Sequence, residues 1–80
     1  MPTILIEDGF RLFFYSNENF EPIHIHVEKG SAVAKFWINP SSLAANYGMK
    51  ASDLNKAGRI VRKHEKMIVE KWHAFFSEKK

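Results

Sequence analysis

The 80-residue sequence contains no cysteine, few glycines or prolines, and no long hydrophobic run. Without cysteine, neither a disulfide nor a thiolate metal site can stabilise the fold. No run approaches the roughly 18 apolar residues that a membrane-spanning helix needs. The opening stretch MPTILIEDGF lacks the basic and hydrophobic segments of a secretion signal. We therefore expect a cytoplasmic protein that is not associated with a membrane, and we expect no cofactor.

Eighty residues allow one domain with one modest core. Seven Phe, two Trp and two Tyr can fill that core by close aromatic packing. Residues 1–40 carry five acidic and three basic side chains, which gives a charge of −2, whereas residues 41–80 carry four acidic and nine basic ones, which gives +5. The second half can therefore attract an anionic partner.

The first half of the chain has the pattern of β-strands. Residues 3–7 and 10–16 are rich in β-branched and aromatic side chains, and Asp8-Gly9 between them is a strong signal for a two-residue hairpin turn. Residues 23–28 alternate between apolar and polar side chains, as a half-buried strand does. Lys29-Gly30 is expected to form the next turn, and the run AVAKFWIN the fourth strand.

The second half has the pattern of a helix. Ser52 is a good N-cap, and hydrophobic residues then recur every three or four positions. Gly58 inside this helix suggests a close approach to a strand. The connection over 40–51 could also hold a short fifth strand around 43–46.

Together these patterns predict a single α+β domain over residues 1–80. An antiparallel meander of four strands (about 2–39) and a connection (about 40–51) precede one long helix (about 52–77), which covers one face of the sheet. Nothing is left in the chain to cover the other face.

The strand alternation predicts which side chains lie on that uncovered face. If Ile23, Ile25 and Val27 pack under the helix, then His24, His26 and Glu28 point the opposite way. Neighbouring strands would add five further side chains, which are Arg11, Phe13, Tyr15, Lys35 and Trp37. Cations and aromatic rings on an open sheet suit single-stranded RNA, which they bind through phosphate contacts and base stacking.

Four other interpretations of this face remain open. His24 and His26 can be ordinary solvent-facing residues, or the aromatic side chains can form a homodimer interface. The two histidines are also weak candidates for a metal site, since they point the same way about 6 to 7 Å apart at Cα. Finally, they could serve as acid and base of a ribonuclease, with Arg11 or Lys35 stabilising the developing charge.

The helix contributes two further predictions. His64 falls within the apolar stripe and is expected to be a core or boundary histidine, hydrogen-bonded to backbone or to a strand side chain. Lys56, Arg59 and Lys63, together with Lys66, occupy the side opposite the stripe. This side is either a solvated surface or a set of phosphate contacts without sequence specificity.

The ordered segments SNENFEPIHIHVEKGSAVAKFWINP, LAANYGMKASDL and IVRKHEKMIVEKWHAFF resemble the small bacterial domains of domain-of-unknown-function family four-one-six-zero. Residues that match its pattern are Pro22, His24, His26, Val27, Lys35, Trp37, His64 and Trp72. Ile23 stands where the family has a second proline. Members are often encoded beside another small domain, an arrangement similar to toxin–antitoxin pairs.

The resemblance therefore implies a cognate small protein partner or an RNA target. The leading hypothesis is a nucleic-acid- or protein-binding component of a toxin–antitoxin-like pair that acts through the open sheet face. Candidate catalytic residues are His24 and His26, and candidate binding residues are Arg11, Tyr15, Glu28, Lys35, Trp37, Lys56, Arg59 and Lys63. A histidine-dependent ribonuclease, a metal-dependent hydrolase and a homodimeric structural domain are the alternatives, so whether the protein is an enzyme stays open.

Overall fold

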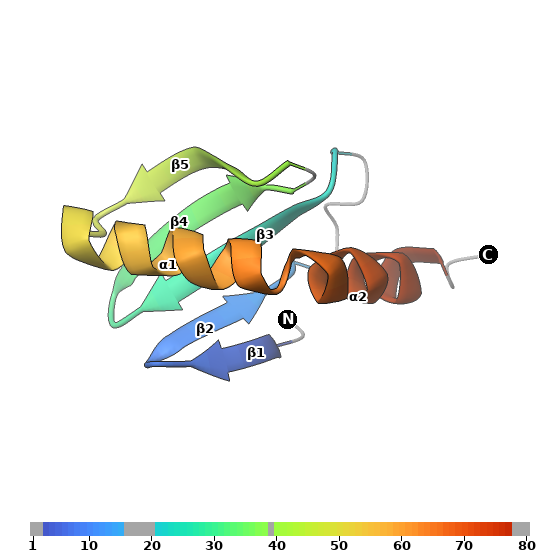
Figure 1. Ribbon diagram of the computed structural model, residues 1–80, viewed down its shortest axis with the longest axis horizontal. Helices are drawn as coiled ribbons and strands as arrows, with labels where there is room; N and C mark the ends of the chain where they lie inside the picture. The colour runs from blue at the N-terminus through green and yellow to red at the C-terminus, as the bar shows by residue number, and fades with distance from the viewer. Residues whose placement is uncertain (1–2, 16–20, 39, 78–80) are drawn as a thin grey trace.

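The computed structural model describes residues 3–15, 21–38 and 40–77. In this part of the chain, a five-stranded antiparallel sheet in sequential order carries two helices on one face (Figure 1). The elements are β1 (Thr3–Glu7), β2 (Phe10–Phe13), β3 (His24–Lys29), β4 (Ala32–Trp37), β5 (Ser42–Tyr47), α1 (Ala51–Lys63) and α2 (Glu65–Ser77). The α+β class and the antiparallel meander are confirmed. The second predicted strand, residues 10–16, is shorter than expected because β2 ends at Phe13, and residue 16 lies outside the described residues.

The two predicted hairpin turns are present. Asp8 and Gly9 both have positive φ values, of 54° and 81°, and Glu7 pairs directly with Phe10. This is the backbone twist that favours Asp-Gly in a two-residue hairpin. The next turn lies one residue later than expected, because Lys29 still pairs with Ala32 and the turn consists of Gly30 and Ser31.

The prediction of four strands is wrong, because residues 42–47 form a fifth strand at the edge of the sheet. Small side chains dominate SLAANY and its hydrophobic residues do not alternate, so pairing with β4 rather than local pattern decides its structure. A register shift puts the two exposed apolar residues of β5 on opposite faces. Leu43 pairs with Phe36 on the helix-covered face, whereas Tyr47 pairs with Val33 on the other.

The prediction of one long helix is also wrong, because the helix breaks at His64 (Figure 1). The His64 amide N–H donates to both the Ile60 and Val61 carbonyl oxygens, at 3.1 and 3.2 Å, and its φ of −110° is not helical. Regular bonding resumes at once, since the Ile68 N–H donates to the His64 carbonyl oxygen at 2.9 Å. The start differs as well: Lys50, not Ser52, occupies the N-cap position, without a side-chain cap bond.

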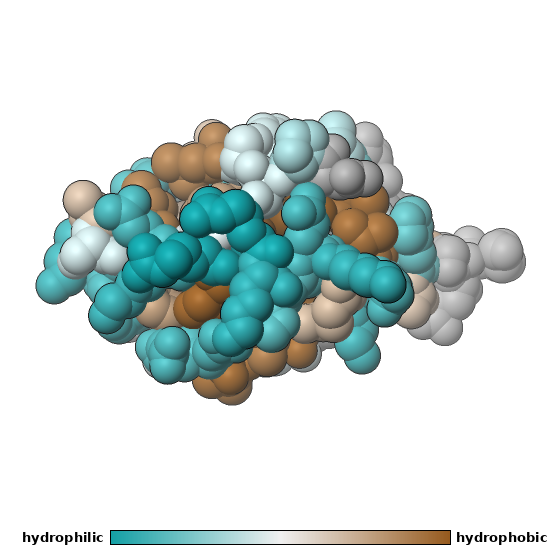
Figure 2. All heavy atoms as spheres, in the orientation of Figure 1, coloured by the Kyte–Doolittle hydropathy of each residue, from teal (hydrophilic) through white to brown (hydrophobic). Residues whose placement is uncertain are grey.

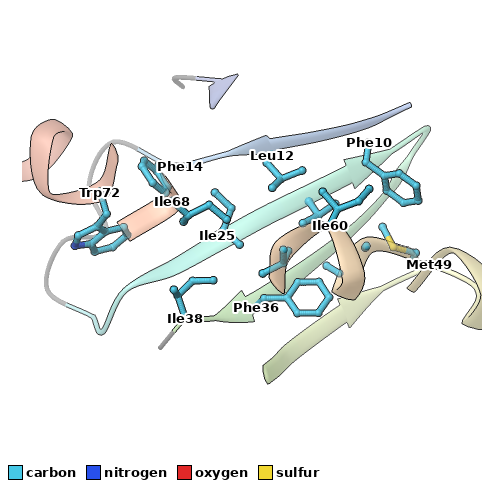
Figure 3. Packing of buried hydrophobic residues seen from close by; sticks show 14 of the residues in the cluster. Phe10, Leu12, Phe14, Ile25, Phe36, Ile38, Met49, Ile60, Ile68 and Trp72 are labelled. Carbon is cyan, nitrogen blue, oxygen red and sulfur yellow. The ribbon is translucent and has the colours of Figure 1, made fainter. Parts of the chain in front are cut away.

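The core lies between the helices and the covered face of the sheet. Figure 3 shows Phe10, Leu12, Ile25 and Phe36 of the sheet facing Ile60 and Met49 in this layer. At one end of the sheet, Trp72 of α2 packs edge-on against Phe14, with ring centroids 5.3 Å apart. The predicted packing of Ile23, Ile25 and Val27 under the helices is confirmed, with Ile23 partly buried at the edge of the core. In the described part of the chain, no helix is both long and apolar enough to cross a membrane.

Gly58 lies in the buried side of α1, near the Phe36 ring of β4, as the sequence suggests. A methyl group at this position would be 3.5 Å from the Arg62 guanidinium and 3.8 Å from the Phe36 ring, which are ordinary contact distances. The structure therefore has room for alanine here, and glycine weakens the helix without a steric reason.

We expect Gly58→Ala to raise the free energy of unfolding by up to about 1 kcal/mol, because alanine is the better helix former. Urea denaturation monitored by circular dichroism measures this change. As a control, Gly9→Ala should destabilise the fold, since Gly9 has a φ of 81°. A lower stability of Gly58→Ala would contradict the spacing described between α1 and β4.

Candidate functional site

The candidate site is the face of the sheet turned away from the helices, which we call the open face. Direct cross-strand partners lie on the same face of an antiparallel sheet, so the register defines its rows. Two rows run across all five strands, one of them through His26, and a shorter row contains His24. The rows are Ile6, Arg11, Glu28, Val33 and Tyr47; Thr3, Phe13, His26, Lys35 and Ala45; and His24, Trp37 and Ser42.

The row from Ile6 to Tyr47 has an ion pair at its centre and apolar side chains at its ends. The Arg11 Nε donates to Glu28 Oε1 at 2.7 Å, and a terminal nitrogen of the same guanidinium donates to Thr3 Oγ1 at 3.0 Å. Ile6 on β1 is 67% exposed and Tyr47 on β5 is 66% exposed. Four strand spacings separate these two, which is about 19 Å.

His24 is almost fully buried, with 1% of its surface exposed. Its Nδ1 lies 2.9 Å from the Pro22 carbonyl oxygen, and because a carbonyl can only accept, Nδ1 carries the proton. The ring meets Trp37 of β4 at 5.8 Å and Trp72 of α2 at 5.1 Å, both between centroids. Trp72 reaches His24 because it lies at the end of the sheet (Figure 3). His24 therefore joins the open face to the helical layer.

His26 is the centre of a second ring cluster and is 7% exposed. Its ring stacks on Phe13 with centroids 5.5 Å apart, and Tyr15 meets it edge-on at 4.5 Å. His24 and His26 also contact each other edge-on, at 5.2 Å. Neither imidazole faces solvent in the way an ordinary polar strand residue does.

The two cations of the open face lie over aromatic rings. The Arg11 guanidinium is 4.2 Å from the Phe13 centroid, and the Lys35 ammonium is 4.6 Å from the Trp37 centroid. Lys35 Nζ also donates to Glu21 Oε1 at 2.8 Å. Each cation thus shields a ring from water while a carboxylate compensates its charge.

This geometry limits the chemistry of the histidine pair. A general acid or base must come within hydrogen-bond reach of a reacting group, and in this structure the rings of His24 and His26 are 1% and 7% exposed. In the described residues, no three metal-ligating side chains lie close enough together to hold an ion. Both histidines contribute ring packing in this structure, and His24 also has a fixed hydrogen bond to the Pro22 carbonyl oxygen.

The structure separates the predicted binding residues into two groups. Arg11, Tyr15, Glu28, Lys35 and Trp37 gather on the open face around His24 and His26, as the alternation predicts. The three helical cations lie elsewhere. Lys56, Arg59 and Lys63 line a hollow of about 580 Å³ between α1 and the β1–β2 turn, together with Glu7, Asp8 and Ile60.

Glu7 links β1 to the break between the helices. Its Oε1 lies 2.8 Å from His64 Nε2, and Lys63 Nζ donates to Oε2 at 3.0 Å. The expected bond between His64 and a strand side chain is therefore present. Both contacts lower the pKa of Glu7 below its ordinary value of 4.5, and the hydrogen bond with His64 has the larger effect.

Sequence reasoning missed several residues of the open face. Glu21 holds Lys35, the Pro22 carbonyl fixes His24, and Trp72 packs on the same imidazole. Tyr47 was missed because the register shift between β4 and β5 changes the face on which it lies, and alternation along a single strand does not reveal this. For Ile6 a signal was available, because a two-residue turn at Asp8-Gly9 pairs Glu7 with Phe10 and therefore places Ile6 opposite Arg11.

The fold and this face define a small α+β module whose sheet is covered by helices on one side and by its own paired side chains on the other. Residues 9–73 match the model of the family described as Domain of unknown function (DUF4160), and the chain belongs to this family. Comparisons with curated proteins and with solved structures found no match.

Glu7→Gln should destabilise the protein at neutral pH and have progressively less effect in acid. Because the folded-state pKa of Glu7 is lowered, its carboxylate contributes stability that is fully present above the unfolded value of about 4.5. That contribution is lost as the pH falls through the lower folded-state pKa. The difference in melting temperature between wild type and variant should therefore be largest at pH 6 to 7 and shrink towards pH 2 to 3.

Glu70→Gln removes an exposed carboxylate from α2 and serves as the control. A Glu7→Gln effect that is the same at neutral and acid pH would contradict the described contacts of Glu7.

Proposed function

We propose that the protein is the binding component of a toxin–antitoxin-like pair and that its open face recognises a cognate small protein. The observation that carries this proposal is the distribution of charge and apolar surface on the face. Both cations of the face, Arg11 and Lys35, are already bound to carboxylates, whereas Ile6 and Tyr47 remain two-thirds exposed. A face with compensated charge and exposed large apolar residues favours a protein partner.

RNA is less well supported as the ligand of this face. Affinity for RNA comes from cations that replace counterions around phosphate, and the side chains that could do so here are paired internally. Stacking also needs accessible rings, but Phe13 is 2% exposed and lies under Arg11, and Trp37 lies under Lys35, which leaves Tyr47 on the edge strand as the large exposed ring.

The same row indicates what the partner surface looks like. Ile6 and Tyr47 are about 19 Å apart across the sheet, with the Arg11–Glu28 pair between them. A complementary surface would place apolar side chains opposite both ends and polar groups opposite the centre. Buried anchors of this kind commonly contribute most of the binding energy of an interface.

The proposal is tested with the cognate small protein that the family resemblance leads us to expect beside this chain. Ile6→Lys/Tyr47→Lys should weaken its binding in isothermal titration calorimetry by about 100-fold, since each lost apolar anchor is worth roughly 1.4 kcal/mol or more. Both positions are exposed, so the variant should keep the wild-type melting temperature.

The matched control is Leu43→Lys/Ala74→Lys, which adds the same charge at two exposed positions away from the open face. It should leave the affinity within about twofold of wild type. Equal loss in both variants, or no loss in the first, would contradict recognition through the open face. Sedimentation of the wild type as a dimer that Ile6→Lys/Tyr47→Lys converts to a monomer would instead assign the face to a second copy of the chain.

A further inference from the structure

The exposed surface of α1 carries charge of one sign. Its exposed charged residues are Lys56, Arg59, Arg62 and Lys63. The carboxylate of α1, Asp53, is partly buried and accepts a hydrogen bond from Lys29 Nζ at 3.3 Å. Four cations without an exposed carboxylate on a helix of 13 residues produce a local positive potential on the side of the molecule opposite the open face.

Three of these cations surround the hollow beside the β1–β2 turn. The hollow has a volume of about 580 Å³ and is bordered by Lys56, Arg59 and Lys63, which are spread over about 10 Å of α1. Ile60 provides an apolar part of its lining. Figure 2 shows the hydrophilic side chains gathered over α1 with a hydrophobic patch between them. The hollow can therefore accept a group that is part anionic and part apolar.

The cations differ in how far their charge is compensated. Lys63 is held by Glu7, whose other oxygen contacts His64, so this carboxylate is engaged on both oxygens. Within residues 3–15, 21–38 and 40–77, no ion pair includes Lys56 or Arg59. Unlike Arg11 and Lys35 on the open face, these two can replace the counterions of a phosphate.

The Asp8 carboxylate at the tip of the turn places a further requirement on a ligand of the hollow, in addition to a phosphate that the cations can bind. An ionised carboxylate only accepts hydrogen bonds, so next to bound phosphate it selects for a donor on the same ligand. The ribose 2′-hydroxyl is such a donor and separates RNA from DNA. A concave site bordered by a turn also suits a flexible single strand better than a duplex.

We propose that this hollow binds single-stranded RNA, with Lys56 and Arg59 on successive phosphates, the ribose against Ile60 and its 2′-hydroxyl donating to Asp8. The site lies on a different face from the protein-binding surface proposed above and rests on different residues. One chain can therefore hold a partner protein and an RNA strand at the same time.

The test uses fluorescence anisotropy with a labelled 12-nucleotide RNA of mixed sequence and the DNA of the same sequence, from 50 to 200 mM salt. Lys56→Gln/Arg59→Gln should weaken RNA binding at least 10-fold and reduce the slope of log K against log salt by about 1.4, at 0.7 for each lost contact. Lys50→Gln/Lys71→Gln removes the same charge from exposed positions outside the hollow and should change binding by less than twofold.

Asp8→Gly keeps a residue that tolerates the positive φ of the turn and removes the acceptor. It should abolish a preference of the wild type for RNA over DNA without weakening DNA binding. Equal effects of the two charge variants, or wild-type binding that does not distinguish RNA from DNA, would overturn the proposal. So would a Lys56→Gln/Arg59→Gln variant that loses the partner protein while it keeps RNA.

Discussion

The structure depends on one constraint: a sheet of five strands has two faces, and the two helices of this chain cover only one of them. The covered face is filled conventionally, by aliphatic and aromatic side chains from both layers. The open face has no second layer among the described residues, so its own side chains bury its rings. Arg11 lies over Phe13, Lys35 lies over Trp37, and carboxylates compensate both cations. Long cationic side chains are suited to this because their stems cover apolar surface while their charged ends remain near water.

His24 connects this arrangement to the rest of the molecule. Its Nδ1–H is fixed on the Pro22 carbonyl, and its ring lies against Trp37 on one side and Trp72 of α2 on the other. The position of α2 also depends on the break at His64. The contact between the His64 ring and the Glu7 carboxylate fixes this break to β1. Two of the four histidines therefore determine how the helices lie on the sheet, and neither role requires catalytic chemistry. The two proposals therefore rest on surfaces that remain accessible, which are the apolar ends of the open face and the cationic side of α1.

Much of this could be predicted from the sequence, and the exceptions have physical reasons. Alternation along 23–28 correctly separates the covered from the open side chains, because a strand has a strict period of two. The Asp8-Gly9 turn is predictable from the sequence, because a two-residue hairpin turn needs positive φ values that few residue types adopt. The edge strand β5 and the break at His64 depend instead on contacts with β4 and with Glu7, which are distant in sequence. Burial of His24 and His26 was missed for the same reason, since it comes from rings on three other elements.

The most direct test of this account is the reactivity of the four histidines with diethyl pyrocarbonate, followed residue by residue with mass spectrometry. His73 on α2 is exposed and provides an internal reference, whereas His24 and His26 are 1% and 7% exposed. We predict that His73 is modified first in the native protein, and that His24 and His26 react at its rate only after unfolding in urea. Modification of His24 or His26 as fast as His73 in the native state would show that the two imidazoles are accessible. It would contradict the account that neighbouring side chains of the open face bury them.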